Sequence, residues 1–161
     1  MRRVLPLVLI VILMIGVRAP SMAAEAARVP LPAPQAGTTL AVGIKQLGYF
    51  DYNPMQGGGI PADVLALSGS RVRMQGTITP WQQGERITAF ALTDGEGCCF
   101  GRPPMIQHVI VVSYPAGLEL AAATKRVTVE GILRVAEKKS DGWVTGLFTL
   151  EASSVTVEPG R

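Results

Sequence analysis

Apolar residues that alternate with polar ones dominate the chain from residue 70 onward, the pattern of half-buried β-strands. In "RVRMQGTI", Val72, Met74 and Ile78 fall on one face of a strand. In "ITAFALT", Ile87 and the two alanines fall on one face, and the Phe and Leu fall on the other. Further strands are predicted in "HVIVVSY", which we expect to be buried on both faces, in "RVTVEGILRV" and in "VTGLFTLEASSVTV".

Two of these strands carry a glycine in their interior. "RVRMQGTI" and "RVTVEGIL" share the form Arg-Val-x-x-x-Gly, with Gly76 and Gly131 where a small barrel must coil. Asp141-Gly142 predicts a two-residue hairpin turn. "IPADVLAL" predicts one short helix or turn, and "GLELAAATK" a helical segment between strands. We therefore expect a mainly all-β fold: a small OB-like, partly open β-barrel of five to six strands with one short helix, a flat sandwich being the alternative.

The N-terminus has the features of an export signal. "MRR" is a basic n-region, and "VLPLVLIVILMIGV" is an apolar run shorter than a typical membrane-spanning helix. We predict a signal peptide, or a retained anchor, over residues 1–24, an Ala/Pro-rich linker over 25–40 and a single OB-like β domain over 41–161. The expected location is the periplasm, with membrane contact only through an uncleaved N-terminal segment.

The net charge argues against nucleic acid as a partner. The chain carries 15 basic and 12 acidic residues, but Arg2, Arg3 and Arg18 belong to the export segment. The remainder is formally neutral and has no visible cluster of Lys and Arg, which binding to phosphate backbones requires.

The segment "GCCFGRPPMIQH" contains both cysteines and the only histidine of the chain. Adjacent Cα atoms lie about 3.8 Å apart across a trans peptide. A disulfide usually joins Cα atoms roughly 4.4–6.8 Å apart, so a Cys98–Cys99 bridge would be strained. Three states of the two cysteines remain open: buried free thiols, a disulfide bridge between chains, or thiolates bound to a metal.

Cys98, Cys99, Met105 and His108 form a soft set of sulfur and nitrogen donors, suited to copper(I) or zinc. Neighbouring residues on a regular strand point to opposite faces, so the two thiols converge only in a turn, which the flanking glycines allow. We favour a structural loop, with a metal site as the alternative. A redox thiol pair is the third reading, and it lacks Cys-x-x-Cys spacing.

No other motif indicates catalysis. One histidine without a defined acidic partner does not form a convincing triad, and we expect the chain not to be an enzyme. Trp81 and Trp143 lie beside predicted turns, where packing is a commoner role for tryptophan than lining a groove.

Several segments resemble a known family. "IPADVLALSGSRVRMQGTITP", "ITAFALT", "GEGCCFGRPPMIQHVIVV" and "RVTVEGILRV" are similar to the exported bacterial family called domain of unknown function 3299. Ser70 stands where that family usually has Lys, and Thr79 replaces the usual residue before the proline. The resemblance spans roughly residues 45–158 and implies an OB-like fold.

The resemblance also implies a role. Some relatives look as though they are encoded beside exporters or metal-responsive transport components, and others keep one Cys at the position of Cys98 with a His nearby, at a spacing that differs from that of His108. We therefore expect an exported, non-catalytic binding or interaction module, an accessory to envelope transport or metal homeostasis. Its partner would be an envelope transporter or another periplasmic protein. The alternative is a soft-metal protein that uses the Cys98-Cys99/His108 loop.

Overall fold

The structure is a computed structural model that describes residues 28–82, 84–95, 103–119 and 126–158. The predicted export segment and both cysteines lie outside these residues. Within the described residues, no helix is long and apolar enough to cross a membrane.

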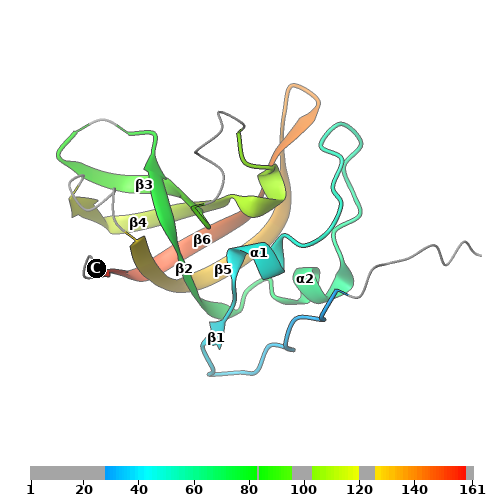
Figure 1. Cartoon of the computed structure of the whole chain (residues 1–161), viewed down its shortest axis with the longest axis horizontal. Helices are drawn as coiled ribbons and strands as arrows, with labels where there is room; N and C mark the ends of the chain where they lie inside the picture. The colour runs from blue at the N-terminus through cyan, green and yellow to red at the C-terminus, as the bar shows by residue number, and fades with distance from the viewer. Residues whose placement is uncertain (1–27, 83, 96–102, 120–125, 159–161) are drawn as a thin grey trace, which may run out of the picture.

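The described residues form six strands, two short helices and one 3₁₀ turn (Figure 1). In chain order they are β1 (Leu40–Ala41), α1 (Ile44–Leu47), α2 (Ala62–Ala66), β2 (Arg71–Pro80), β3 (Arg86–Thr93), η1 (Ile106–His108), β4 (Ile110–Glu119), β5 (Arg126–Ser140) and β6 (Trp143–Val157).

The six strands form one mixed sheet whose pairing closes into a ring. The order is β1-β2-β3-β4-β6-β5, and β2 pairs with β5 as well. The pairs are antiparallel except β1–β2 and β4–β6, which are parallel. The predicted mainly all-β fold is confirmed. The ring-like pairing agrees with a partly open, OB-like barrel rather than a flat sandwich.

β2 closes the ring by changing partner along its length. Residues 71–77 pair with β5, and residues 77–80 pair with β3. Gly76 lies just before the change, and a Cβ there would overlap the carbonyl oxygen of Thr93. Gly131 of β5 pairs with Val72 of β2 and lies at a register shift in the pairing with β6, and a Cβ there would overlap the backbone of Glu151. The predicted role of both glycines in strand coiling is supported, because only a residue without a side chain permits these approaches.

β3 departs from the simple alternation predicted for it. Ile87 is buried, and so are Phe90 and Leu92, although Ile87 should share a face with the alanines. A register shift lies between Ile87 and Ala89 in the pairing with β4. A β-bulge of this kind adds one residue to a strand and moves the following side chains to the other face.

β4 also differs from its prediction. It begins at Ile110, after η1, so His108 does not open the strand. Ile110 and Val112 are buried while Ser113 is exposed, so the strand has one core face, not two.

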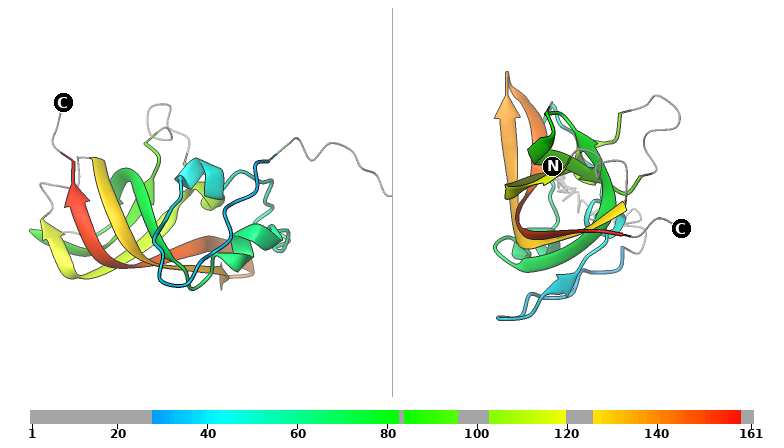
Figure 2. Two further views of the ribbon diagram at one scale, coloured as in Figure 1. Left: turned by 90° about the horizontal axis from the view of Figure 1, so that it is seen from below. Right: turned by 90° about the vertical axis from the view of Figure 1, so that its left-hand side faces the viewer.

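Two helices stand where one was expected. α2 occupies the predicted helix in "IPADVLAL", and α1 is additional. The helix predicted in "GLELAAATK" is wrong over residues 117–119, which belong to β4; the described residues do not cover the rest of that segment. Figure 2 shows the strands curling around the core, with α1 and α2 packed beside them. The helices bury Ile44, Leu47 and Val64 against it.

The Asp141-Gly142 hairpin is confirmed. β5 ends at Ser140 and β6 begins at Trp143, which pair with each other. Asp141 and Gly142 have φ values of 51° and 83°. Positive φ at both positions is the requirement of a type I′ turn.

Residues 28–38, here called the N-terminal strap, pack against the domain. The Arg28 Nη1 atom donates to Asp63 Oδ1 of α2 at 2.6 Å, and the Leu31 N–H donates to Asp63 Oδ2 at 2.9 Å. The Leu31 side chain joins the core and is only 6% exposed. This part of the predicted linker is therefore attached to the barrel.

Replacing Gly131 by alanine tests the closure of the ring. The added methyl group meets backbone atoms of β6 that cannot move independently, so we expect a loss of about 1–3 kcal/mol in the free energy of unfolding. The matched control is Gly146→Ala on β6, where nothing lies within 4 Å of the added Cβ. We expect it to change stability by no more than about 0.5 kcal/mol. Urea denaturation measures both, and equal losses would contradict the explanation.

Candidate functional site

One end of the barrel gathers three segments that are distant in sequence. They are the loop of residues 50–59, η1 with its approach at 103–105, and the hairpin tip at 137–144; together we call them the hairpin end (Figure 1). The Val144 N–H donates to the Pro54 carbonyl at 2.9 Å and so fixes the loop to the hairpin.

A carboxylate on β5 holds the same loop. Glu137 Oε1 accepts a hydrogen bond from the Tyr52 hydroxyl at 2.6 Å and another from the Gly58 N–H. Lys139 Nζ lies 3.4 Å from the other oxygen of Glu137. Edge-to-face contact between the rings of Phe50 and Tyr52, with centroids 6.2 Å apart, supports the tyrosine.

These contacts shift two pKa values. The hydrogen bonds from Tyr52 and Gly58, and then Lys139, lower the pKa of Glu137. Burial, together with the hydrogen bond and the negative charge of Glu137, raises the pKa of Tyr52 to about 12. At neutral pH the pair is therefore a protonated tyrosine that donates to an ionised glutamate.

The three consecutive glycines of the loop are required by its shape. Gly57, Gly58 and Gly59 have φ values of 69°, 74° and 79°, a conformation that residues with a side chain rarely adopt. The run turns the Gly58 N–H toward Glu137. The middle residue of the run is therefore held by a hydrogen bond to a carboxylate on β5.

Large apolar side chains are exposed at this end. Met55 is 65% exposed on the loop, and Trp143 is 51% exposed at the hairpin tip. The Val144–Pro54 hydrogen bond places these two residues on neighbouring stretches of backbone. Met105 is 58% exposed and directly precedes η1. η1 lies beside β6, because β4, which follows η1, pairs with β6 in parallel from Ile110↔Phe148 onward. The hairpin end therefore presents two methionine side chains and one tryptophan side chain to solvent.

η1 is fixed by close packing against the residues after α1. The Gln107 side chain, only 5% exposed, donates to the Phe50 carbonyl at 3.3 Å. A Cβ at Gly48 would overlap both the Gln107 carbonyl and the His108 ring, so glycine is required there as well. The sequence offered no signal for this contact.

Of the four predicted metal ligands, the structure describes Met105 and His108, while Cys98 and Cys99 lie outside the described residues. His108 Nε2 is 3.1 Å from the Gly48 carbonyl oxygen. Because a carbonyl only accepts, Nε2 carries the proton, and the lone pair of the neutral imidazole is on Nδ1. Backbone carbonyls orient metal-binding histidines in the same way, so His108 fits ligation through Nδ1.

The Met105 thioether is at the surface, 3.7 Å from the Gln107 amide nitrogen. No group of three or more His, Cys, Asp or Glu side chains suited to a metal occurs among the residues that the structure describes. The described residues thus supply at most two donors, and a four-ligand site would need the cysteines.

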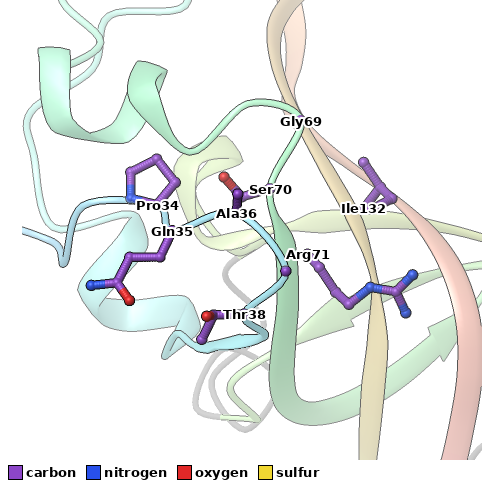
Figure 3. A pocket seen from close by; sticks show the side chains of 9 residues that line it. Pro34, Gln35, Ala36, Thr38, Gly69, Ser70, Arg71 and Ile132 are labelled. Atoms are coloured by element: carbon purple, nitrogen blue, oxygen red, sulfur yellow. The ribbon is translucent and has the colours of Figure 1, made fainter.

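A shallow pocket of about 330 Å³ lies between the N-terminal strap and the start of β2. Figure 3 shows strap residues on one side and Gly69, Ser70 and Ile132 on the other, with the Arg71 guanidinium pointing away from the strap. The remaining polar groups that line it are uncharged, so the pocket offers little to fix a charged ligand.

A second pocket of about 360 Å³ opens at the other end of the strap. Its lining residues are Arg28, Val29, Lys45, Gln46 and Tyr49. We call it the Arg28 pocket. It contains two cationic side chains, which distinguish it from the first.

The fold and the hairpin end define an OB-like β-barrel with an apolar, loop-built end. A profile of the family described as protein of unknown function (DUF3299) matches residues 60–157. The chain therefore belongs to the DUF3299 family, and the predicted membership is confirmed.

A solved structure of a family member agrees with this assignment. A DUF3299 family protein from Pseudomonas aeruginosa PAO1 is 25% identical with a TM-score of 0.53, over 68% of this chain and 76% of that one. The S. pombe Stn1–Ten1 complex gives 11% identity and a TM-score of 0.41, over 79% of this chain and 83% of the matched chain. No curated protein matches the chain.

The Tyr52–Glu137 hydrogen bond predicts a pH dependence. A lowered pKa means that ionised Glu137 contributes stability above its ordinary pKa of 4.5, and that this contribution is lost as the pH falls through the folded-state value. Glu137→Gln should therefore lower the melting temperature at pH 7, and the difference from the wild type should shrink toward pH 3.

The control is Glu151→Gln, which removes an ion pair with Arg134 whose side chains are 57% and 55% exposed. Exposed pairs of this kind contribute little. Thermal denaturation across the pH range compares the three proteins. If the difference in melting temperature between Glu137→Gln and the wild type is the same at pH 3 as at pH 7, the stabilising role of ionised Glu137 is contradicted.

Proposed function

We propose that the chain is an exported, non-catalytic interaction module that docks a protein partner through its hairpin end. The observation that carries the proposal is the exposure of Met55, Met105 and Trp143 at one end of the barrel. Methionine and tryptophan are enriched where proteins bind one another.

The loop that presents Met55 is held firmly. Glu137 binds both Tyr52 and Gly58, and the Pro54 carbonyl accepts from Val144. A surface fixed before binding loses less conformational entropy when a partner docks. A binding role therefore explains why a surface loop is fixed so firmly around exposed apolar groups.

The expected partner is a component of envelope transport or another periplasmic protein, in a role that supports transport or metal homeostasis. This follows from the predicted export segment and from the family resemblance. The near-neutral charge of the exported part favours a partner recognised through apolar contact over one recognised through charge.

Site-specific photo-crosslinking in living cells tests the docking surface. A crosslinking residue at Trp143 should capture a component of an envelope transporter or another periplasmic protein. The matched control is Trp81, which is 52% exposed, compared with 51% for Trp143. Trp81 directly follows β2, and the β2–β3 connection lies on the opposite side of Figure 1 from the hairpin.

Alanine replacement of Met55 and Trp143 together should remove the crosslink formed at a third position, Met105. Because both side chains are largely in solvent, we expect the thermal stability to be nearly unchanged. No capture at Trp143, or equal capture at Trp81, would overturn the proposal.

The alternative function is soft-metal binding by Cys98, Cys99, His108 and Met105. The orientation of His108 by the Gly48 carbonyl favours it, since the Nδ1 lone pair remains for a metal. Copper(I) or zinc would then be held by two thiolates and the imidazole, with the Met105 thioether as the fourth ligand.

Anaerobic titration of the reduced protein with copper(I) and with zinc, against a competing chelator, tests this function. We expect one metal ion per chain, bound more tightly than about 1 µM. The variants Cys98→Ser and His108→Ala should lose it. Binding weaker than this limit, or retained in both variants, would contradict the metal site.

A further inference from the structure

A buried guanidinium lies beside the Arg28 pocket, away from the hairpin end. The Arg28 side chain is only 11% exposed, and its Nη1 atom donates to Asp63 Oδ1 at 2.6 Å. Burial opposes ionisation of Asp63, but the Leu31 N–H and Arg28 outweigh it and lower the pKa of Asp63. Arg28 is therefore held in place by one edge of its guanidinium.

The other edge of Arg28 has no partner within the part of the chain that the structure describes. Its Nε–H and Nη2–H groups are buried and donate to no acceptor there. These two N–H groups are parallel, and together they match the two oxygens of a carboxylate or phosphate. Buried donors without acceptors are unfavourable, so a bound oxyanion would stabilise this arrangement.

The pocket brings further donors to the same place. Lys45 and Gln46 of α1 and Tyr49 just after it line the pocket with Arg28. Lys45 also lies 3.9 Å from Asp94 Oδ2, and its side chain is 55% exposed. The lining thus supplies an ammonium, an amide and a phenol around the guanidinium.

Two of the lining side chains are exposed. Val29 and Tyr49 are 73% and 61% exposed, so a change of rotamer at these positions disturbs little packing. We expect such a change to open a path from the pocket to the Nε and Nη2 atoms of Arg28.

We propose that the Arg28 pocket binds an oxyanion with at least two acceptor oxygens, a phosphate or carboxylate group, through the Nε and Nη2 atoms of Arg28. Lys45 contributes charge, and Tyr49 closes over the ligand. The proposal is independent of the docking surface, since it uses none of the residues of the hairpin end.

Inorganic phosphate is the probe, titrated into the exported chain beginning at residue 25, with chloride at equal ionic strength as the reference. The Nε–H resonance of Arg28 in the unmutated protein should shift and saturate, with a dissociation constant of about 1 mM or tighter. If phosphate causes no saturable shift of this resonance beyond the shift that chloride causes, the proposed site is overturned.

Arg28→Lys keeps the charge next to Asp63 but lacks the paired N–H groups, and it should weaken phosphate binding about tenfold or more. Arg73→Lys is the matched control, because Arg73 donates its Nε to Glu130 at 2.6 Å on an exposed face. It should change the affinity by less than about twofold. Equal effects of the two variants overturn the proposal. If Arg28→Lys does not fold, the wild-type resonance alone decides.

A second arm of the experiment distinguishes a lipid headgroup from a soluble anion as the source of the oxyanion. The group is a lipid headgroup if the wild type, but not Arg28→Lys, sediments with phosphatidylglycerol vesicles, and if inorganic phosphate releases the protein from them. Saturable binding of phosphate without vesicle binding assigns it to a soluble anion.

Discussion

The whole structure depends on backbone segments that approach too closely for any side chain to fit between them. Gly76 lies against β3 and Gly131 against β6, and at these two places the strands bend enough for β2 to pair with both β3 and β5. Without that double pairing the sheet would have free edges and no enclosed core for Phe90 and Phe148. The order of the strands, and hence the meeting of loop, hairpin and η1 at one end, follows from this closure.

Local patterns in the sequence predicted most of the fold. Alternation located the strands, Asp141-Gly142 located the hairpin, and the shared Arg-Val-x-x-x-Gly located the two coiling positions. The bulge in β3 was missed because one extra residue changes which face is buried without altering composition. The helix predicted in "GLELAAATK" is wrong over residues 117–119, because Leu118 and Glu119 pair with β3 and this tertiary pairing overrides the helix preference of leucine and glutamate.

The contacts that shape the hairpin end could not have been found in this way. Tyr52 and Glu137 are 85 positions apart, and neither belongs to a motif. The three glycines were visible, but their function depends on a carboxylate that the fold brings to them. His108 was identified from the chemistry of its side chain alone, whereas its tautomer depends on the Gly48 carbonyl, a backbone atom with no signature in sequence.

The attachment of the N-terminal strap has a geometric consequence for an anchored form of the protein. Arg28 and Leu31 are tied to α2, so the chain is attached to the barrel from residue 28 onward. With the predicted anchor retained over residues 1–24, four peptide steps would separate it from Arg28, a reach of about 14 Å when fully extended. The barrel would then lie close to the bilayer, with Arg28 within that reach of the membrane surface.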